Sequence, residues 1–227
     1  MNIVITAGGT EEPIDKVRKI TNMSTGKLGS IICNELCNDE NNNIFYICNK
    51  KSIKPKEVLN IQIIETTDTK SVEIAIHNIL NNNKIDVFIH SMAISDYSVE
   101  GAYYFEKSHY GDMDITLEKI DNSSKMKSSE DEIYLKLVKT PKIIDSIKVL
   151  DKSLKLISFK LLNNVPKSEL ISVGLAQLKR TNSFIVVAND LTDIKNGNHK
   201  AQLIKEDGTF FEVNSKEEIA RTLKDLI

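Results

Sequence analysis

The stretch Met1–Ser30, MNIVITAGGTEEPIDKVRKITNMSTGKLGS, decides the fold of this chain. Its first part, Asn2–Ala7, is an apolar, β-branched run of strand length. Gly8 and Gly9 follow at once, and glycines there let the backbone turn sharply and approach a ligand. A helix is predicted to begin at Ser24-Thr25-Gly26, with Ser24 or Thr25 as its N-terminal cap. A strand, a glycine turn and a helix N-terminus together indicate an anion-binding α/β unit.

Two common phosphate-binding motifs are absent from this stretch. Lys27 follows Gly26, but Leu28 stands where a P-loop has the hydroxyl residue that holds magnesium. The pattern G-x-G-x-x-G is missing because the segment from Thr10 to Met23 separates the glycine turn from the helix. That segment is longer than the usual strand-to-helix loop of about two to six residues. Long loops in compact domains are usually functional, and a surface turn without a ligand is the alternative interpretation.

The composition is that of an ordinary globular protein. The chain has 227 residues, of which 41% are hydrophobic and 27% charged, with a net charge of −2. One substantial domain is expected at this length. The charge balance does not favour a nucleic-acid or membrane partner, and no secretory signal or membrane-length apolar run is visible. The sequence therefore predicts a cytoplasmic protein, whose cysteines Cys33, Cys37 and Cys48 are reduced and partly buried.

Strand-like and helix-like segments alternate along most of the chain. Strands are predicted at Asn43–Asn49, Ile61–Glu65, Asp86–His90, Leu154–Lys160 and Ser183–Ala188. Helices are predicted after Thr67-Asp68-Thr69, from Thr140-Pro141 to about Leu150, and from about Pro166 to Arg180. This order indicates an α/β fold with a Rossmann-like, mostly parallel sheet flanked by helices. Ligands of such sheets bind at the carboxyl ends of the strands, where Gly8-Gly9-Thr10, Met92–Tyr97 and Asn189-Asp190 are expected. Near the C-terminus, Asp207-Gly208 predicts a hairpin, and Ser215 is expected to cap the last helix.

The segment from about residue 98 to 137 interrupts the alternation. Two runs of alternating hydrophobicity, Asp114–Ile120 and Glu132–Leu137, flank the polar segment Asn122–Ser129. The pattern predicts an inserted β-hairpin beside the main sheet, with the lysine-bearing loop as a flap. A solvated surface loop without a function is the alternative.

At this point the chain resembles the phosphopantothenate–cysteine ligases. The resemblance rests on segments that occur in order along nearly the whole chain: Ile5–Thr10, Glu12–Arg18, Asn22–Gly29, Ala93–Tyr97, Lys125–Ser128, Leu137–Ile144, Phe159–Leu161 and Val187–Asp190. It implies one ligase domain over residues 1–227, in the stand-alone bacterial form without a fused flavin-dependent decarboxylase. Family members are homodimers, and the hairpin at about 98–137 would supply the dimer surface.

The resemblance also implies an activity and a set of site residues. The carboxylate of 4′-phosphopantothenate would attack the α-phosphate of CTP, with Mg²⁺ and without flavin, to give an acyl-cytidylate and pyrophosphate. The amine of L-cysteine would then form the amide and release CMP. The catalytic residues would be Asn22, Lys125 and Arg18. Nucleotide binding is implied for Gly8, Gly9, Thr10, Ser24, Thr25, Gly26, Asp96, Phe159, Lys160 and Asn189, and substrate binding for Asn22, Arg18, Met92 and Ala93.

Several points stay open at the level of sequence. The metal ligands are not identified, Lys200 is a weaker phosphate candidate, and His199 is expected to be exposed. Arg18 could instead form a structural salt bridge with Asp15, and Phe159 could belong to the core. ATP could replace CTP. A non-catalytic nucleotide-binding protein of the same fold and a dinucleotide oxidoreductase are the alternative classes; the missing G-x-G-x-x-G weakens the second.

Overall fold

The computed structural model describes residues 1–105, 117–127, 129, 131–195 and 199–227. Its centre is an eight-stranded sheet with the strand order β13-β12-β11-β10-β6-β1-β4-β5. These strands are β1 (Asn2–Ala7), β4 (Asn43–Asn49), β5 (Ile61–Thr66), β6 (Val87–His90), β10 (Lys155–Leu162), β11 (Ile185–Asp190), β12 (Ala201–Lys205) and β13 (Phe210–Val213). The pairs from β5 through to β11 are parallel, and β12 and β13 continue the sheet in antiparallel pairing. The predicted Rossmann-like, mostly parallel sheet is confirmed.

Helices cover both faces of this sheet because its strands are apolar on both sides. Along β1, Ile3 and Ile5 pack into one core cluster and Val4 into another, as the alternation of a strand requires. The first cluster lies under α1 (Lys27–Leu36) and α6 (Lys216–Leu226), and the second under α2 (Thr69–Asn82) and α3 (Ile143–Leu150). A third cluster joins α4 (Lys167–Thr181) to β11 and β12.

The order of the central strands creates the place where a ligand is expected. From β1 the chain adds β4 and β5 on one side, and it then returns to add β6 and β10 on the other side. The chain therefore leaves the carboxyl ends of the neighbouring strands β1 and β6 towards opposite sides of the sheet, and the direction of winding reverses between these two strands. In open α/β sheets ligands bind in the crevice at that point.

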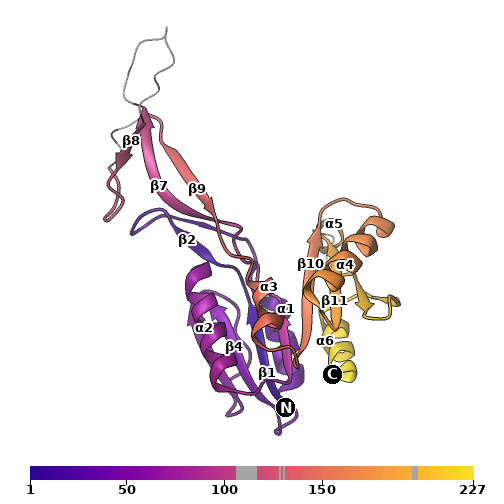
Figure 1. Cartoon of the computed structure of the whole chain (residues 1–227). Helices are drawn as coiled ribbons and strands as arrows, with labels where there is room; N and C mark the ends of the chain where they lie inside the picture. Colours follow the sequence, from indigo (N-terminus) through magenta and orange to yellow (C-terminus); the bar gives the residue numbers. More distant parts are fainter. Residues whose placement is uncertain (106–116, 128, 130, 196–198) are drawn as a thin grey trace.

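An arm of three strands extends from the main sheet (Figure 1). It consists of β7 (Tyr97–Phe105), β8 (Leu117–Ile120) and β9 (Tyr134–Lys139), in the order β8-β7-β9. Both outer strands pair antiparallel with β7, so the predicted hairpin between the two alternating runs is wrong in its pairing. The reason is that Tyr97–Phe105, which was not predicted as a strand, lies between them. Residues 114–116 of the first run lie outside the described residues.

The starts of the helices differ partly from the sequence predictions. The N-cap of α1 is Gly26, with φ of 78°, and not Ser24 or Thr25. A residue with that φ has the left-handed conformation, which glycine adopts without steric cost. The helix α3 begins at Ile143, later than the predicted start at Thr140, and a short helix α5 (Leu191–Lys195) was not predicted.

The predicted caps of α2 and α6 are confirmed. Asp68 caps α2 by accepting a hydrogen bond from Ser71 N, and Ser215 caps α6 by accepting one from Glu218 N. The hairpin β12–β13 turns at Gly208, which has φ of 83°, and is also confirmed. In the described part of the chain, no helix has the length and apolar character needed to cross a membrane.

Candidate active site

A cavity of about 410 Å³ opens at the carboxyl ends of the central strands. Seven of the residues singled out from the sequence line it: Ser24, Met92, Ala93, Asp96, Phe159, Lys160 and Asn189. They come from four separate segments, namely the start of α1, the loop after β6, and the ends of β10 and β11. The structure therefore brings together residues that lie far apart in the sequence, at the edge of the sheet where the strand order predicts a ligand.

The loop after β6 is fixed to the glycine turn after β1. Ala93 N donates to Gly8 O at 2.8 Å, and Thr10 N donates to Ala93 O at 3.1 Å. The Asn22 side chain reaches the same point, because its Nδ2 donates to Ala93 O at 3.0 Å. Asn22 and Thr10 do not line the cavity, but these bonds place them directly behind its Ala93 wall.

The glycines of the first turn pack against protein atoms on the side where a Cβ would be. A Cβ on Gly8 would lie 1.9 Å from Ser52 Oγ, and one on Gly26 would lie 3.1 Å from Ser52 Cβ. A Cβ on Gly9 would lie 3.0 Å from the carbonyl oxygen of Asn22. Close packing within the chain therefore suffices to require glycine at Gly8. Gly8, Gly9, Thr25 and Gly26 do not line the cavity, and their binding of phosphate stays a prediction.

Two histidines line the cavity as neutral rings. Burial lowers the pKa of His90 to about 4, and its Nδ1 lies 2.9 Å from Thr6 Oγ1. Burial, together with the charge of Lys216, lowers the pKa of His199 to about 4. The prediction that His199 is exposed is wrong: it is half-buried, and neither ring nitrogen has a hydrogen-bond partner among the described residues. No local pattern indicates this burial, because His199 follows a polar segment.

The charged candidates differ in what surrounds them. Asp96 forms an ion pair with Lys142 at 2.5 Å, and both side chains are about 60% exposed. An incoming ligand could displace such a pair, because exposed ion pairs contribute little stability. Lys200 pairs with Glu212 at 3.0 Å and does not line the cavity. This weakens the case for Lys200 as a phosphate ligand.

Arg18 and Lys125 lie outside the cavity. Arg18 forms a two-point salt bridge with Asp15, through Nε at 3.0 Å and Nη2 at 2.7 Å. The structural role considered for Arg18 is thus present. The Lys125 side chain is exposed, and its neighbour Met126 is bonded to the same two residues, Asp15 and Arg18. Arg18 and the Lys125 segment therefore form a second group, next to β2 (Glu11–Pro13) and β3 (Lys19–Thr21).

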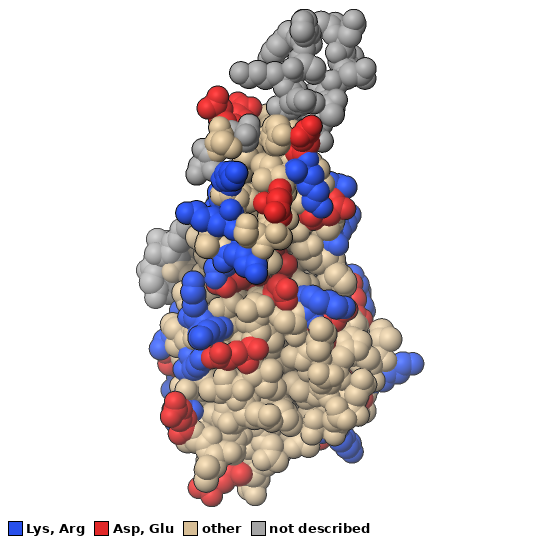
Figure 2. All heavy atoms as spheres, turned by 90° about the vertical axis from the view of Figure 1, so that its left-hand side faces the viewer, with Lys and Arg blue, Asp and Glu red and all other residues tan. Residues whose placement is uncertain are grey.

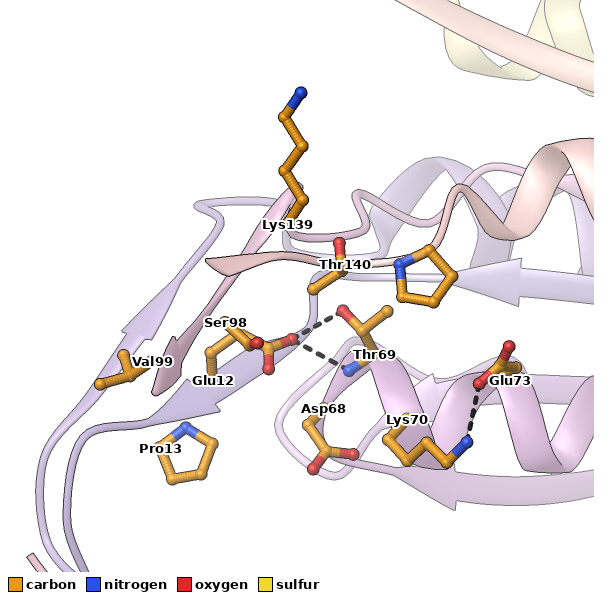
Figure 3. Close-up of a pocket in the computed structure, with 11 residues that line it drawn as sticks. Glu12, Pro13, Asp68, Thr69, Lys70, Glu73, Ser98, Val99, Lys139 and Thr140 are labelled. Carbon is orange, nitrogen blue, oxygen red and sulfur yellow. Dashed lines mark hydrogen bonds and ion pairs between the residues drawn. The ribbon is translucent and has the colours of Figure 1, made fainter. Parts of the chain in front are cut away.

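A second pocket, of about 370 Å³, lies between β2, the N-terminus of α2 and the base of the arm. Figure 3 shows Glu12 facing the first turn of α2, where its Oε1 accepts bonds from Thr69 N at 2.9 Å and Thr69 Oγ1 at 2.7 Å. A helix N-terminus attracts anions, but here a carboxylate of the protein already occupies it. This pocket is therefore a weaker candidate for a phosphate than the cavity.

A resident metal site is not evident in the part of the chain that the structure describes. No three His, Cys, Asp or Glu side chains of these residues gather as a metal-binding group. Cys33, Cys37 and Cys48 are free and buried, as expected for reduced structural thiols. Asp96 is the only carboxylate among the described residues that line the cavity.

Comparisons with known proteins agree with the motif resemblance. A protein of Thermococcus kodakarensis named "Coenzyme A biosynthesis bifunctional protein CoaBC" is 33% identical over 205 residues, which are 90% of this chain and 45% of that protein. The protein of the same name from Methanocaldococcus jannaschii is 31% identical over 200 residues, 84% of this chain and 40% of that protein. The chain thus spans less than half of the length of these two relatives.

A solved structure is similar over the full length of the chain. The crystal structure described as "DNA/Pantothenate Metabolism Flavoprotein from Streptococcus pneumoniae" matches with a TM-score of 0.86 and 33% identity, and the match covers 100% of this chain and 97% of that one. The family model "DNA/pantothenate metabolism flavoprotein C-terminal domain" matches residues 1–122 and 118–227. The chain belongs to this family.

Proposed function

We propose that this chain is a phosphopantothenate–cysteine ligase of coenzyme A biosynthesis. The observation that carries the proposal is the cavity at the carboxyl ends of the strands, which unites seven of the residues singled out from the motifs. Membership of the family and the names of the relatives, which are coenzyme A biosynthesis proteins, support the same pathway. Whether the chain acts without a fused decarboxylase stays a prediction, because it spans only 40–45% of these relatives.

The proposed reaction has two steps and requires no protein nucleophile. The carboxylate of 4′-phosphopantothenate attacks the α-phosphate of CTP, so that a C–O–P bond forms and pyrophosphate leaves. The amine of L-cysteine then attacks the acyl carbon, CMP leaves, and an amide remains. The protein must hold two anions together and stabilise the charge that develops on oxygen. Lys160 and Asn189 supply a cation and an amide in the cavity for the nucleotide.

The neighbouring residues take the acyl part of the substrate in this proposal. Met92 and Ala93 form the wall of the cavity, and Asn22 lies behind Ala93. An amide group can stabilise an oxyanion without adding a competing charge. Arg18 and Lys125 would provide positive charge for the phosphoryl group and the acyl intermediate. Phe159 offers a partly buried aromatic ring for the base.

Magnesium is proposed to accompany the triphosphate. Mg²⁺ commonly binds substrate phosphates with only one or two protein carboxylates. Asp96 could serve as such a ligand once its pairing with Lys142 is released. We propose CTP rather than ATP as the nucleotide, and a reaction without flavin.

The test is pyrophosphate release from CTP and from ATP, measured in parallel with 4′-phosphopantothenate and Mg²⁺. We expect release that depends on the acid, and cysteine should convert the acyl-nucleotide into the amide. Asn189→Ala and Lys160→Gln should lower the rate, whereas Lys200→Gln, outside the cavity, serves as the matched control. No release with either nucleotide in folded protein would refute the ligase proposal, and nucleotide binding without release would favour the non-catalytic alternative.

We also propose that the chain forms a homodimer through the arm. The arm exposes apolar side chains, including Tyr97 at 48% and Leu137 at 44%, and Ile133, which directly precedes β9, is 42% exposed. Figure 2 shows charged side chains of both signs on the upper part of the molecule, where the arm lies. Interfaces are enriched in aromatic side chains at their core and carry polar groups at their rim, so the exposed apolar side chains of the arm could form such a core and the charged ones such a rim. Light scattering of the eluted protein should give twice the chain mass of 25.6 kDa, and Leu137→Lys should shift it towards a monomer; a monomeric wild type would contradict the proposal.

A further inference from the structure

Asp15 is a buried carboxylate that accepts five hydrogen bonds. Its side chain is 0% exposed. Oδ1 accepts bonds from Val17 N at 2.8 Å and Arg18 N at 2.7 Å. Oδ2 accepts bonds from Arg18 Nε at 3.0 Å, Arg18 Nη2 at 2.7 Å and Met126 N at 3.0 Å. The two oxygens therefore have different tasks: Oδ1 closes a local turn, and Oδ2 connects two segments that are distant in the sequence.

The connection is reinforced on both sides of Oδ2. Arg18 Nη2 also donates to Met126 O at 3.1 Å, so the guanidinium bridges the carboxylate and the backbone of the second segment. Asn122 Nδ2 donates to Ile14 O at 3.0 Å. The Met126 side chain is buried, with 3% exposed. The segment 122–126 is thus attached to the turn 14–18 at both of its ends, and Lys125 lies between the two attachments.

We propose that Asp15 is a positioning residue that holds Arg18 and the backbone of Lys125 in one fixed arrangement for the ligase reaction. This inference rests on the proposed function. Arg18 is fixed by its bonds to Oδ2, and Lys125 is fixed through the adjacent Met126. The Lys125 side chain itself stays exposed and available to a ligand. A positive group that is held in place in advance stabilises developing charge without reorganising during the reaction.

The chemistry of the site explains why a carboxylate is needed. Burial raises the pKa of Asp15, but the bonds from the Arg18 guanidinium and from the three backbone N–H groups outweigh it and hold the pKa well below its usual range. Asp15 is therefore ionised at all working pH values. An amide has one acceptor oxygen only, and its NH₂ group would face the guanidinium and the Met126 N–H, which are donors themselves.

Because an amide has one acceptor oxygen and a carboxylate has two, a single substitution at Asp15 can remove the bonds of Oδ2 and keep those of Oδ1. In Asp15→Asn the amide oxygen can keep the two N–H groups of the turn, while the NH₂ group replaces Oδ2 and breaks the connection. A residue that only stabilises the turn would tolerate this change. Asp121→Ala is the matched control, because it removes an exposed carboxylate that bonds Ser123 two residues away, through the backbone N–H and the side chain, and not the turn 14–18.

The experiment combines amide hydrogen exchange with kinetics. In Asp15→Asn we expect the Met126 amide to exchange about ten- to hundredfold faster, the range expected for loss of a hydrogen bond to a charged group. The kcat should fall by a similar factor, while the KM for the nucleotide changes by less than about threefold. In a background that carries both Arg18→Gln and Lys125→Gln the further loss of kcat should largely vanish, since Asp15 acts through these two groups. Asp121→Ala should leave kcat unchanged.

Each outcome decides the matter. Unchanged exchange at Met126, or a kcat loss from Asp15→Asn that is undiminished in the background with Arg18→Gln and Lys125→Gln, would overturn the proposal. If Asp15→Asn does not fold, Asp15→Ser, whose hydroxyl can still accept the bonds of the turn, is tested by the same readouts. The exchange measurement needs no ligase activity. A wild type without pyrophosphate release but with fast exchange in Asp15→Asn would refute the proposed function and leave the structural coupling established.

Discussion

Gly29 in α1 allows this helix to lie directly on the first strand. A Cβ added at Gly29 would lie 2.5 Å from Ala7 Cβ and 3.0 Å from Ser91 Oγ. Ala7 is 0% exposed, and its Cβ is attached directly to the backbone of β1, so it cannot move away by rotation. The change Gly29→Ala should therefore push α1 off the sheet, even though alanine is the better helix former.

The magnitude follows from two opposing effects. Replacing glycine by alanine in a helix stabilises by about 1 kcal/mol. Forcing a methyl group into a filled core costs about 1–3 kcal/mol, and the upper half of this range applies because optimal carbon contacts are about 3.5–4.0 Å. We expect the free energy of unfolding to fall by about 1–2 kcal/mol, which lowers Tm by roughly 2–8 °C for a chain of this size.

Urea denaturation followed by circular dichroism measures this change, and two variants make the test specific. Gly174→Ala is the matched control: its new Cβ would meet the tip of Ile204, Cδ1, at 2.3 Å, and that flexible end can rotate away. We expect little net change there. Ala7→Gly combined with Gly29→Ala removes the closest contact and should recover about 1 kcal/mol. A Gly29→Ala protein as stable as the wild type, or a double variant without recovery, would refute this reasoning.

Three further predictions concern the stability and reactivity of the fold. Glu12→Ala should lower the free energy of unfolding by about 1–3 kcal/mol, because it leaves Thr69 N and Oγ1 without their acceptor; an unchanged urea midpoint would contradict this. Since burial lowers the pKa of His90 to about 4, from 6.5 in an unfolded chain, protonation favours unfolding, and stability should fall by up to about 3 kcal/mol as the pH drops from about 6.5 to 4. His90→Gln should flatten that part of the stability–pH curve. Burial raises the pKa of the Cys48 thiol to about 11 and that of Cys33 further, so a thiol reagent should label them only after denaturation; rapid labelling of folded protein would show that these thiols are not buried.

The main sheet could be predicted from the sequence because its strands carry a local signal. Asn2–Ala7 and Val87–His90 are short apolar runs, and strands buried on both faces need such runs. The caps Asp68 and Ser215 were predictable for the same reason, since a capping bond forms between residues three positions apart. The positions of the loops at the carboxyl edge then followed from the strand order of the fold class.

The pairing in the arm and the surroundings of His199 could not be predicted in this way. The segment Tyr97–Phe105 pairs with both alternating runs, and Ala102 is buried where it pairs with Ile120 and Leu135, which are distant in the sequence. Burial of His199 likewise depends on the cavity that several strands and loops form together. The attachment of Met126 to Asp15 joins positions 111 residues apart and left no local trace. The hydrophobic periodicity of a segment does not show which distant segment it will contact, so it could not predict these tertiary contacts.

The long segment between β1 and α1 leaves the end of β1 at Gly8 and returns close to it at Gly26. A Cβ on Gly26 would lie 3.2 Å from Gly8 N, so the chain returns to the place that it left. Between these two glycines it forms β2 and β3 and binds, through Asp15, the segment that connects β8 to β9. Gly8 has φ of 85° and Gly26 has φ of 78°, and both pack against Ser52. Substitution of either glycine would therefore deform the turn whether or not it binds phosphate. Loss of activity in such a variant cannot identify a phosphate contact, whereas substitution of Asn189 or Lys160, whose side chains line the cavity, can do so.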